Sequence, residues 1–303
     1  MNVTMADSYR DCCQLTRATA GNFYYSFWVL PAEKRRAQCA LYAFFRRTDD
    51  LGDTQAPIEE RRRALSDWRA AWQRAQHDDC VDPLLPAIVD AVRRYAIPPE
   101  YLTTAIDGVA SDLDRTRFAA FDELQAYCYQ VAGVVGLASI HVWGFRHDPE
   151  VFEAARACGT AFQLTNILRD IAEDFRLGRV YLPQDELARF GVAEEQIARG
   201  VVDDRWREFL RFQIDRAESY YTQARRLNRW LEPDGQKIYG AMTDIYHAIL
   251  QKIRGRDGDV FGGRVRLTPW HKAFLALKHL RPRLGRRFEG ASPQVVELRG
   301  GAR

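Results

Sequence analysis

Apolar residues recur at every third or fourth position over most of this chain, and this spacing constrains the fold more than any other feature. The repeat is typical of helices that pack one face on a core, and runs that alternate like a strand are few. Pro31, Gly178 and Pro233 stand at expected helix boundaries. The sequence therefore predicts an all-α, single-domain bundle with long helices near residues 32–53, 58–76, 84–96, 121–143, 149–177, 204–230 and 234–254.

The composition is that of an ordinary globular protein. Of the 303 residues, 47% are hydrophobic and 28% are charged, which is enough to bury a large core. No segment rich in Pro, Gly or Ser divides the chain before its end. We therefore expect one helical domain over residues 1–285 and a flexible tail over residues 286–303.

Charge is interspersed along the chain, with 44 Lys and Arg residues, 41 Asp and Glu residues and a net charge of +3. Because no basic block is present that could follow a phosphate backbone, we expect no nucleic-acid partner. The one basic bias runs from His271 to Arg287. It fits a solvated face better than a weak contact with a membrane surface.

Six cysteines show no C-x-x-C spacing and most lie in apolar helical patterns, so we expect neither a disulfide framework nor a zinc site. His141, His147, His247 and His271 also lack ligand spacing and are expected to serve packing or the surface. No segment reaches the roughly 18 uninterrupted apolar residues that a transmembrane helix needs. We expect a cytoplasmic protein, with peripheral contact to the inner face of the membrane as a further option.

The segment LYAFFRRTDDLGD places polar side chains along one face of an expected helix. Tyr42, Arg46, Asp49 and Asp53 follow one another at steps of four, three and four, and residues at these spacings are neighbours on a helix surface. Aromatic and aliphatic residues occupy the adjoining face, so this helix is not simply polar on its outer side. One cation and two carboxylates therefore share a face of a largely apolar helix.

The segment FQLTNILRDIAEDFRLGRVYLP repeats this arrangement. Gln163, Asn166, Asp170 and Asp174 follow one another at steps of three, four and four. Two carboxylates at i and i+4 destabilise an isolated helix by roughly 0.2–0.5 kcal/mol, so each pair requires either solvent or a cation. Helical bundles place ligand and metal sites between helices that face each other.

A hard cation that shares phosphate ligands is the function that these two stripes favour. Mg²⁺ takes one or two protein carboxylates and fills its other positions with water and substrate phosphate oxygens; Mn²⁺ is an alternative. Arg46 is expected to bind phosphate through two hydrogen bonds, and Gln163 and Asn166 to add donors or a ligand oxygen. A lone D-x-x-x-D is common on solvated faces, so the prediction depends on both stripes together.

At these residues the sequence resembles the squalene/phytoene synthase family. The family's aspartate-rich motifs correspond to RRTDDLGD (46–53) and QLTNILRDIAEDFRLGRVYLP (163–183), and further matches are NFYYSFWVLP (22–31), YCYQVAGVVG (127–136) and DVFGGRV (259–265). The resemblance covers residues 8–280 and implies an isoprenoid-synthase-like helical bundle with a central cavity.

The resemblance also implies roles for individual residues. Tyr127 matches a tyrosine implicated in proton handling, Tyr246 and Arg264 match positions that close over a diphosphate, and Phe23 matches an aromatic residue that lines the prenyl cavity. The candidates are, as catalytic residues, Tyr127, Tyr42 and Arg46; as metal ligands, Asp49, Asp53, Asn166, Asp170 and Asp174; and as substrate-binding residues, Phe23, Asn22, Gln163, Arg169, Tyr246 and Arg264.

Some residues around the motifs carry less weight. Many relatives have small hydroxyl residues just ahead of the matching Phe, whereas this chain has Ala20, Gly21 and Asn22; Asn22 can still donate a hydrogen bond. Three charged residues lie off the two stripes, and we expect them to act mainly as surrounding or surface charges: Asp50, Arg169 and Glu173.

The activity that the resemblance implies is a magnesium-dependent, head-to-head condensation of two allylic isoprenyl diphosphates. Loss of one diphosphate gives an allylic cation in a dry aromatic cavity. The 2,3-double bond of the second substrate attacks this cation, and proton loss to Tyr127 or to the released diphosphate closes a cyclopropane. A second ionisation ends in squalene, hydroxysqualene, or dehydrosqualene or phytoene, according to whether hydride, water or proton loss quenches it. NADPH use stays open.

Four hypotheses follow from the motifs. The segments YYSFWVLP and VAGVVGLASIHVWGF favour two farnesyl diphosphates and a presqualene or squalene-type product of thirty carbons. Phytoene from two geranylgeranyl diphosphates is the alternative, which VYLPQDELARFGV fits equally well. A non-catalytic assembly or binding relative should have lost the aspartates, and a head-to-tail prenyltransferase or terpene cyclase should space its second site differently. Isoprenyl diphosphates are the expected partners, and downstream isoprenoid enzymes are candidates.

Overall fold

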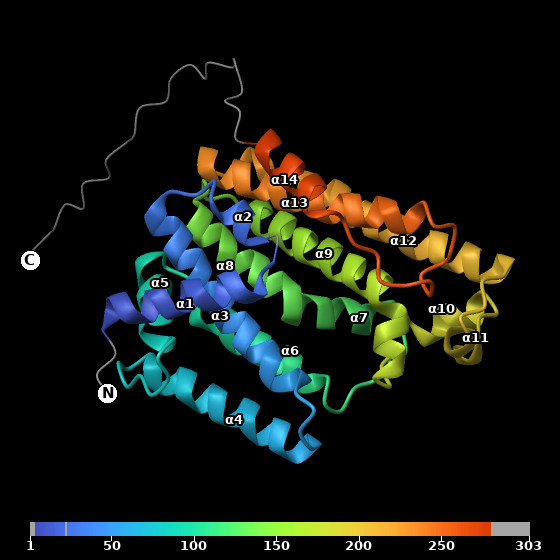
Figure 1. Ribbon diagram of the computed structural model, residues 1–303, viewed down its shortest axis with the longest axis horizontal. Coiled ribbons are helices and arrows are strands. Elements are labelled where there is room, and N and C mark those ends of the chain that lie inside the picture. The colour runs from blue at the N-terminus through green and yellow to red at the C-terminus, as the bar shows by residue number, and fades with distance from the viewer. Residues whose placement is uncertain (1–3, 22, 280–303) are drawn as a thin grey trace, which may run out of the picture.

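Long amphipathic helices stack side by side in this protein, and the computed structural model describes residues 4–21 and 23–279 (Figure 1). The prediction of an all-α fold is confirmed, because these residues contain two isolated bridges and no β-strand. The helices are α1 Met5–Thr19, α2 Phe23–Phe27, α3 Ala32–Asp53, α4 Ile58–Ala75, α5 Leu85–Arg94, α6 Pro99–Ser111, α7 Phe121–Cys128, the π-helix η1 Tyr129–Gly133, α8 Val134–Trp143, α9 Pro149–Arg176, α10 Gln184–Arg189, α11 Glu194–Arg199, α12 Asp204–Ala224, the 3₁₀-helix η2 Arg225–Arg229, α13 Pro233–Arg254 and α14 Pro269–Lys278.

The predicted segments correspond closely to α3, α4, α5, α9 and α13, while two others are interrupted. The predicted segment 121–143 consists of α7, η1 and α8, and 204–230 ends in η2. The apolar pattern does not predict α1, because its buried face consists of Ser8, Cys12 and Thr16. The predicted domain boundary at residue 285 lies outside the described residues and stays a prediction.

Helix α9 runs through the middle of the bundle, with α12, α13 and α14 on one side and α3, α4 and α6 on the other (Figure 1). Two clusters of buried side chains form the core, and α9 belongs to both. Val151 and Ala155 in its first half pack in the cluster around α3, α5 and α8. Leu164 and Ile167 in its second half pack in the cluster around α12 and α13. The second polar stripe therefore lies where the two parts of the core meet.

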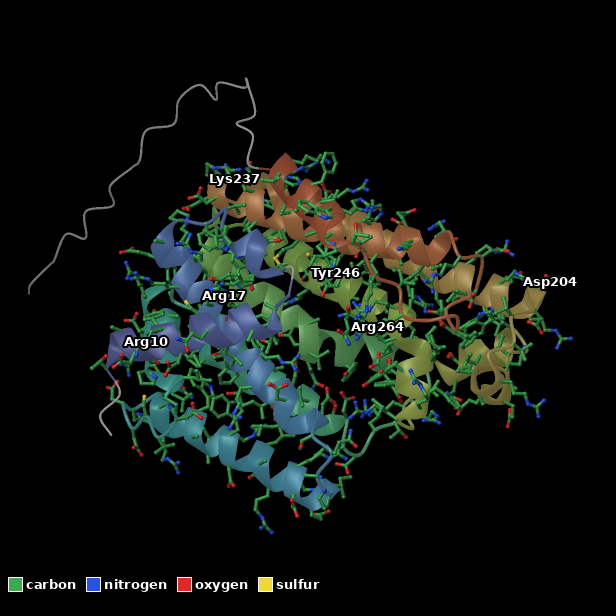
Figure 2. All side chains as sticks on the ribbon, in the orientation of Figure 1. Arg10, Arg17, Asp204, Lys237, Tyr246 and Arg264 are labelled. Carbon is green, nitrogen blue, oxygen red and sulfur yellow. The ribbon has the colours of Figure 1, made fainter. Side chains whose placement is uncertain are left out.

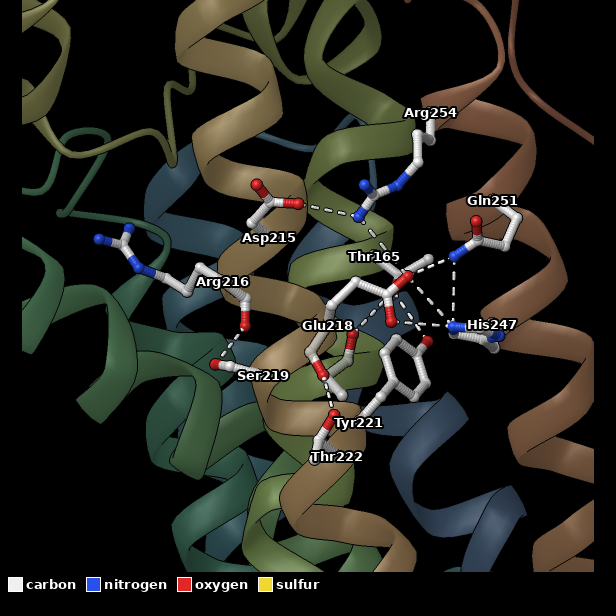
Figure 3. Close-up of polar contacts among 11 residues, drawn as sticks. Thr165, Asp215, Arg216, Glu218, Ser219, Tyr221, Thr222, His247, Gln251 and Arg254 are labelled. Atoms are coloured by element: carbon white, nitrogen blue, oxygen red, sulfur yellow. Dashed lines mark hydrogen bonds and ion pairs between the residues drawn. The ribbon is translucent and has the colours of Figure 1, made fainter.

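Polar contacts join α9, α12 and α13 behind this stripe (Figure 3). The hydroxyl groups of Thr165 and Tyr221 lie 2.9 Å apart and are buried. Glu218 accepts a hydrogen bond of 2.9 Å from His247 Nε2 and another from Gln251. His247 thus takes part in packing between helices, as its lack of ligand spacing predicts.

Helices α8 and η1 approach α9 closely because glycines stand at the crossing. A Cβ atom at Gly136 would lie 3.0 Å from the backbone oxygen of Ala155, and one at Gly159 would overlap the backbone carbonyl of Ala132. Gly136 and Gly159 therefore permit the close packing of these helices. The π-helix lies at the same crossing, and single-turn π-helices are frequent at functional sites.

Replacing Gly159 with Ala is expected to lower the free energy of unfolding by about 2 kcal/mol, because the new methyl group must displace the backbone of η1. Urea unfolding monitored by circular dichroism would measure this loss. Gly255→Ala is the matched control, since a Cβ there would make only an ordinary contact of 3.5 Å. Equal unfolding midpoints for the two variants would contradict the packing described for Gly159.

Candidate active site

A cavity of about 280 Å³ lies between α3, α6, η1, α8, α9 and α13. Most of its lining is apolar and includes Phe27, Phe45, Ile140, Leu227 and Met242. The charged residues of the lining and the stripe residues beside them lie toward one end; they are Tyr42, Arg46, Asp49, Gln163 and Asn166. An apolar chamber with a charged mouth suits a ligand that has a hydrocarbon chain and an anionic head.

The opposite end of the cavity is closed by a buried hydrogen-bonded group that the sequence did not indicate. Trp143 Nε1 donates to Gln38 Oε1 at 2.8 Å, and Gln38 Nε2 donates to Ser139 Oγ at 3.3 Å. All three side chains are buried and line the cavity. Because a buried network whose hydrogen bonds are all made is rigid, this group closes one end of the apolar cavity with side chains of fixed position.

The first stripe stands at the mouth, on the last turns of α3. Tyr42, Arg46 and Asp49 line the cavity, and Asp53 lies one turn further on. Arg46 pairs with Asp50 at 2.6 Å, while its Nε atom is buried without a hydrogen-bond partner. The side chain of Asp49 is exposed in part, but protein surrounds most of its carboxyl group. This desolvation and the negative charge of Asp53 raise the pKa of Asp49 to about 7.

The second stripe lies on α9. Gln163 and Asn166 line the cavity, and the Oδ1 atom of Asn166 is buried without a hydrogen-bond partner. Asp170 is held by two arginines, since Arg169 Nε lies 2.8 Å and Arg264 Nη2 2.8 Å from its carboxylate oxygens. Arg169 therefore contacts a stripe residue directly, although it lies off the stripe in the sequence.

Asp174 completes this stripe one turn beyond Asp170. Burial and the negative charge of Asp170 raise the pKa of Asp174 to about 7. Arg179 contacts one stripe and acts electrostatically on the other: its Nη1 atom lies 3.2 Å from Asp53 Oδ1, and its positive charge lowers the pKa of Asp174 against the effect of burial. Arg179 thus interacts with a member of each aspartate pair, and no helical spacing in the sequence indicated this role.

Tyr127 lies beside this cluster and does not line the cavity. Its hydroxyl group donates to Asp112 Oδ2 at 2.7 Å and lies 3.5 Å from the hydroxyl of Tyr181, whose ring stacks on it. Desolvation raises the pKa of Asp112 to about 6, and its second oxygen, Oδ1, is buried without a hydrogen-bond partner. Sequence reasoning did not find Asp112 and Tyr181, because no helical spacing links them to Tyr127.

The remaining candidates are placed as follows. Tyr246 on α13 lines the cavity, and its ring stacks on Phe162 with centroids 4.2 Å apart. Arg264 contacts Asp170 and lies 3.5 Å from Glu173. The predictions for Asn22 and for the side chain of Phe23 lie outside the described part of the chain.

A divalent metal ion fits these donors when it shares phosphate ligands. Within residues 4–21 and 23–279, no three His, Cys, Asp or Glu side chains converge closely enough to hold a metal alone. The carboxylates occur as pairs on α3 and α9, and the buried Oδ1 of Asn166 is a further oxygen donor. Mg²⁺ takes few protein carboxylates and keeps water and phosphate oxygens, which is what this donor set offers.

Three raised carboxyl pKa values predict how the metal-free protein responds to pH. Asp49 and Asp174 have pKa values of about 7 and Asp112 of about 6, all above the ordinary value. Between about pH 4 and pH 7 the folded state therefore binds protons that the unfolded chain has released, so stability falls as pH rises.

In EDTA, the thermal unfolding midpoint is expected to fall by a few degrees between about pH 5.5 and pH 8. The variant Asp49→Asn/Asp174→Asn should show a clearly smaller fall, because it lacks two of the three carboxyl groups. Differential scanning fluorimetry at both pH values would measure this difference. An equal fall in the two proteins would be inconsistent with the electrostatics described for these aspartates.

A family model described as squalene/phytoene synthase matches residues 16–271 of the chain, which is most of its length. The chain belongs to the squalene/phytoene synthase family. The resemblance seen in the motifs is thus confirmed. Among the relatives, a 15-cis-phytoene synthase from Synechococcus elongatus is 38% identical over 280 residues, covering 89% of this chain and 91% of that protein.

Solved structures of this family share the fold. A dehydrosqualene synthase in complex with a ligand superposes with a TM-score of 0.83 at 24% identity, covering 91% of this chain and 96% of that one. A squalene synthase from Alicyclobacillus acidocaldarius superposes with a TM-score of 0.79 at 27% identity, covering 85% of this chain and 97% of that one. The predicted isoprenoid-synthase-like bundle is therefore confirmed.

Proposed function

We propose that this protein is a prenyltransferase that joins two geranylgeranyl diphosphates head to head to form phytoene. The observation that supports the reaction type is the apolar cavity lined by Asp49, Gln163 and Asn166, with one aspartate pair on α3 and another on α9. The relative from S. elongatus, named a phytoene synthase, supports the substrate length.

The product of thirty carbons that the segments YYSFWVLP and VAGVVGLASIHVWGF favour is less well supported. The squalene synthase among the solved structures is 27% identical to this chain, whereas the phytoene synthase is 38% identical over 89% of it. Squalene-type condensation of two farnesyl diphosphates therefore becomes the second candidate, and the forty-carbon product becomes the main proposal.

The residues at the mouth bind and orient the diphosphates. Arg46 offers its unpartnered Nε, and Gln163 offers an amide, to phosphate oxygens that enter between α3 and α9. When bound, Mg²⁺ would be held by Asp49, Asp53, Asn166, Asp170 and Asp174 and would neutralise the charge of the departing diphosphate. Residues on α3 and residues on α9 would therefore contact the diphosphates of the substrates from opposite sides.

The apolar chamber keeps the reacting carbons away from water. Phe45 and Phe162 line it, and aromatic rings stabilise a developing allylic cation. Tyr127 and Asp112, hydrogen-bonded to each other beside the mouth, provide a route for the proton that leaves when the cyclopropane closes. The second step ends with a further proton loss, so it needs no reductant.

A competition experiment tests the proposed chain length. The purified protein is incubated with magnesium and equal concentrations of farnesyl and geranylgeranyl diphosphate, with and without NADPH, and the products are analysed by mass spectrometry. We expect a forty-carbon hydrocarbon to predominate and NADPH to have no effect. A predominant thirty-carbon product would support the squalene-type candidate, and NADPH-dependent squalene would contradict the proton-loss ending.

A further inference from the structure

Large apolar side chains gather on the outer face of α14 and at the end of α2. Trp270, Phe274 and Leu277 are spaced by four and three residues, so they share one face of α14, and they are 86%, 68% and 58% exposed. Trp28, at the end of α2, is 57% exposed. Helices α14 and α2 lie in contact beside α13 (Figure 1).

We call the surface formed by Trp28, Trp270, Phe274 and Leu277 the apolar face. These exposed side chains lie together and are not scattered over the protein surface. Among the described residues, nine large hydrophobic side chains are exposed, and four of them belong to this face. Single exposed apolar residues are normal on a monomer, whereas a contiguous patch marks a contact surface. The opposite side of α14 already packs inward through Leu275 and Ala276, so burial in the core does not account for the outer face.

A surface groove of about 620 Å³ continues the apolar face between α14 and the helices α1 and α2. It is lined by Tyr24, Trp28, Val29 and Leu277 together with the basic side chain of Arg17, which Figure 2 labels. The groove therefore extends the apolar surface beside the exposed side chains of α14. A hydrocarbon chain or the acyl part of a lipid layer could enter it.

Basic side chains lie beside the apolar face. The Arg35 guanidinium lies 4.7 Å from the centre of the Trp28 ring, and Arg17 lines the groove that adjoins the apolar face. In the sequence, the residues directly after α14 include Arg281, Arg283, Arg286 and Arg287, and the first acidic residue is Glu289. Apolar side chains that include tryptophan, with cations beside them, bind the interface of an anionic lipid layer.

The position of the face relative to the cavity fits a lipid partner. Helix α14 packs against α13 and α2, and both of these helices line the cavity, through Tyr246 and Met242 on α13 and Phe27 on α2. A layer that rests on α14 is therefore separated from the cavity by one layer of helices. Among the described residues, no helix has the length and hydropathy needed to span a bilayer.

We propose that the apolar face of α2 and α14 docks the protein on an anionic membrane surface, with Trp270, Phe274 and Leu277 entering the interface and neighbouring basic side chains, among them Arg17 and Arg35, contacting lipid headgroups. This surface goes beyond the proposed reaction and does not depend on it. The sequence alone favoured a solvated face for the basic segment; the exposed side chains of α14 favour a lipid partner.

Binding of the full-length protein to vesicles tests this proposal. Vesicles of phosphatidylcholine with one third phosphatidylglycerol are sedimented with wild type, with Trp270→Ser/Phe274→Ser and with Val81→Ser. Val81 is 59% exposed and lies far along the chain from α14, so its variant is a matched control. We expect the double variant to lose at least about tenfold in partition coefficient, and the control to equal wild type.

The contribution of charge to vesicle binding is measured by changing the lipid composition and the salt concentration. Binding of wild type should weaken strongly in pure phosphatidylcholine and in high salt, because the basic side chains beside the face then lose their anionic partner. Circular dichroism shows whether the double variant is folded, and sedimentation velocity without vesicles gives its oligomeric state. Equal partition of wild type and a folded double variant would overturn the proposal. The proposal would also be overturned if wild type were a dimer that did not bind vesicles and the double variant were a monomer. A second copy of the chain would then occupy the apolar face.

Discussion

Asp49→Asn and Asp170→Asn are each expected to lower kcat by about a thousandfold or more while the protein stays folded. Each substitution removes a negative charge from one of the two helices at the cavity mouth, and neither removes packing from the core. Steady-state assays with geranylgeranyl diphosphate over a range of magnesium concentrations would measure the loss. A variant with near wild-type kcat would contradict the role assigned to its aspartate.

The two variants should differ in stability, which separates charge from packing. At pH 8, without metal, the carboxylate of Asp49 is ionised above its pKa of about 7, so Asp49→Asn is expected to stabilise the fold by about 1 kcal/mol. Asp170 instead neutralises Arg169 and Arg264, and its loss should cost roughly 1–3 kcal/mol. Asp67→Asn on the exposed face of α4 is the control and should change neither quantity.

Tyr127→Phe is expected to lower kcat by about a hundredfold with little change in KM. The substitution removes the hydroxyl group that donates to Asp112 at 2.7 Å, and it leaves the cavity lining intact. Single-turnover assays that follow the cyclopropyl diphosphate would locate the effect at the step in which the cyclopropane forms. An unchanged single-turnover rate would argue against a role for Tyr127 in moving the proton.

The hydrogen-bonded pair can be tested as a unit. If Tyr127 and Asp112 act together, Asp112→Asn should slow the same step, and the double variant Tyr127→Phe/Asp112→Asn should be no slower than the worse single variant. Tyr101→Phe, a half-buried tyrosine on α6, serves as the control and should keep wild-type kcat. Multiplicative losses in the double variant would show that the two residues act separately.

Local spacing explains why so much of the bundle could be predicted from the sequence. Tyr42, Arg46 and Asp49 share a face of α3 because steps of three and four residues are local helix geometry. The same spacing puts Gln163 and Asn166 on the cavity side of α9. The apolar periodicity also predicted the long helices, and most predicted helix ends agree with the structure within one or two residues.

Contacts between distant segments could not be predicted from such spacing. Asp112 and Tyr127 are joined only when α6 ends beside α7, and Gln38 meets Trp143 across 105 positions of the chain. Helix α14 was missed for a different reason. Its largest apolar side chains point outward, so its pattern does not report burial in the core.

The most direct test of the central claim uses geranylgeranyl diphosphate that has two deuterium atoms on carbon 1. Head-to-head condensation to phytoene removes one hydrogen from carbon 1 of each substrate, whereas head-to-tail joining removes none. Mass analysis of the magnesium-dependent product is expected to show a forty-carbon hydrocarbon that retains two of the four deuterium atoms. A forty-carbon product that keeps all four, or a protein that releases no hydrocarbon from either geranylgeranyl or farnesyl diphosphate, would contradict the account.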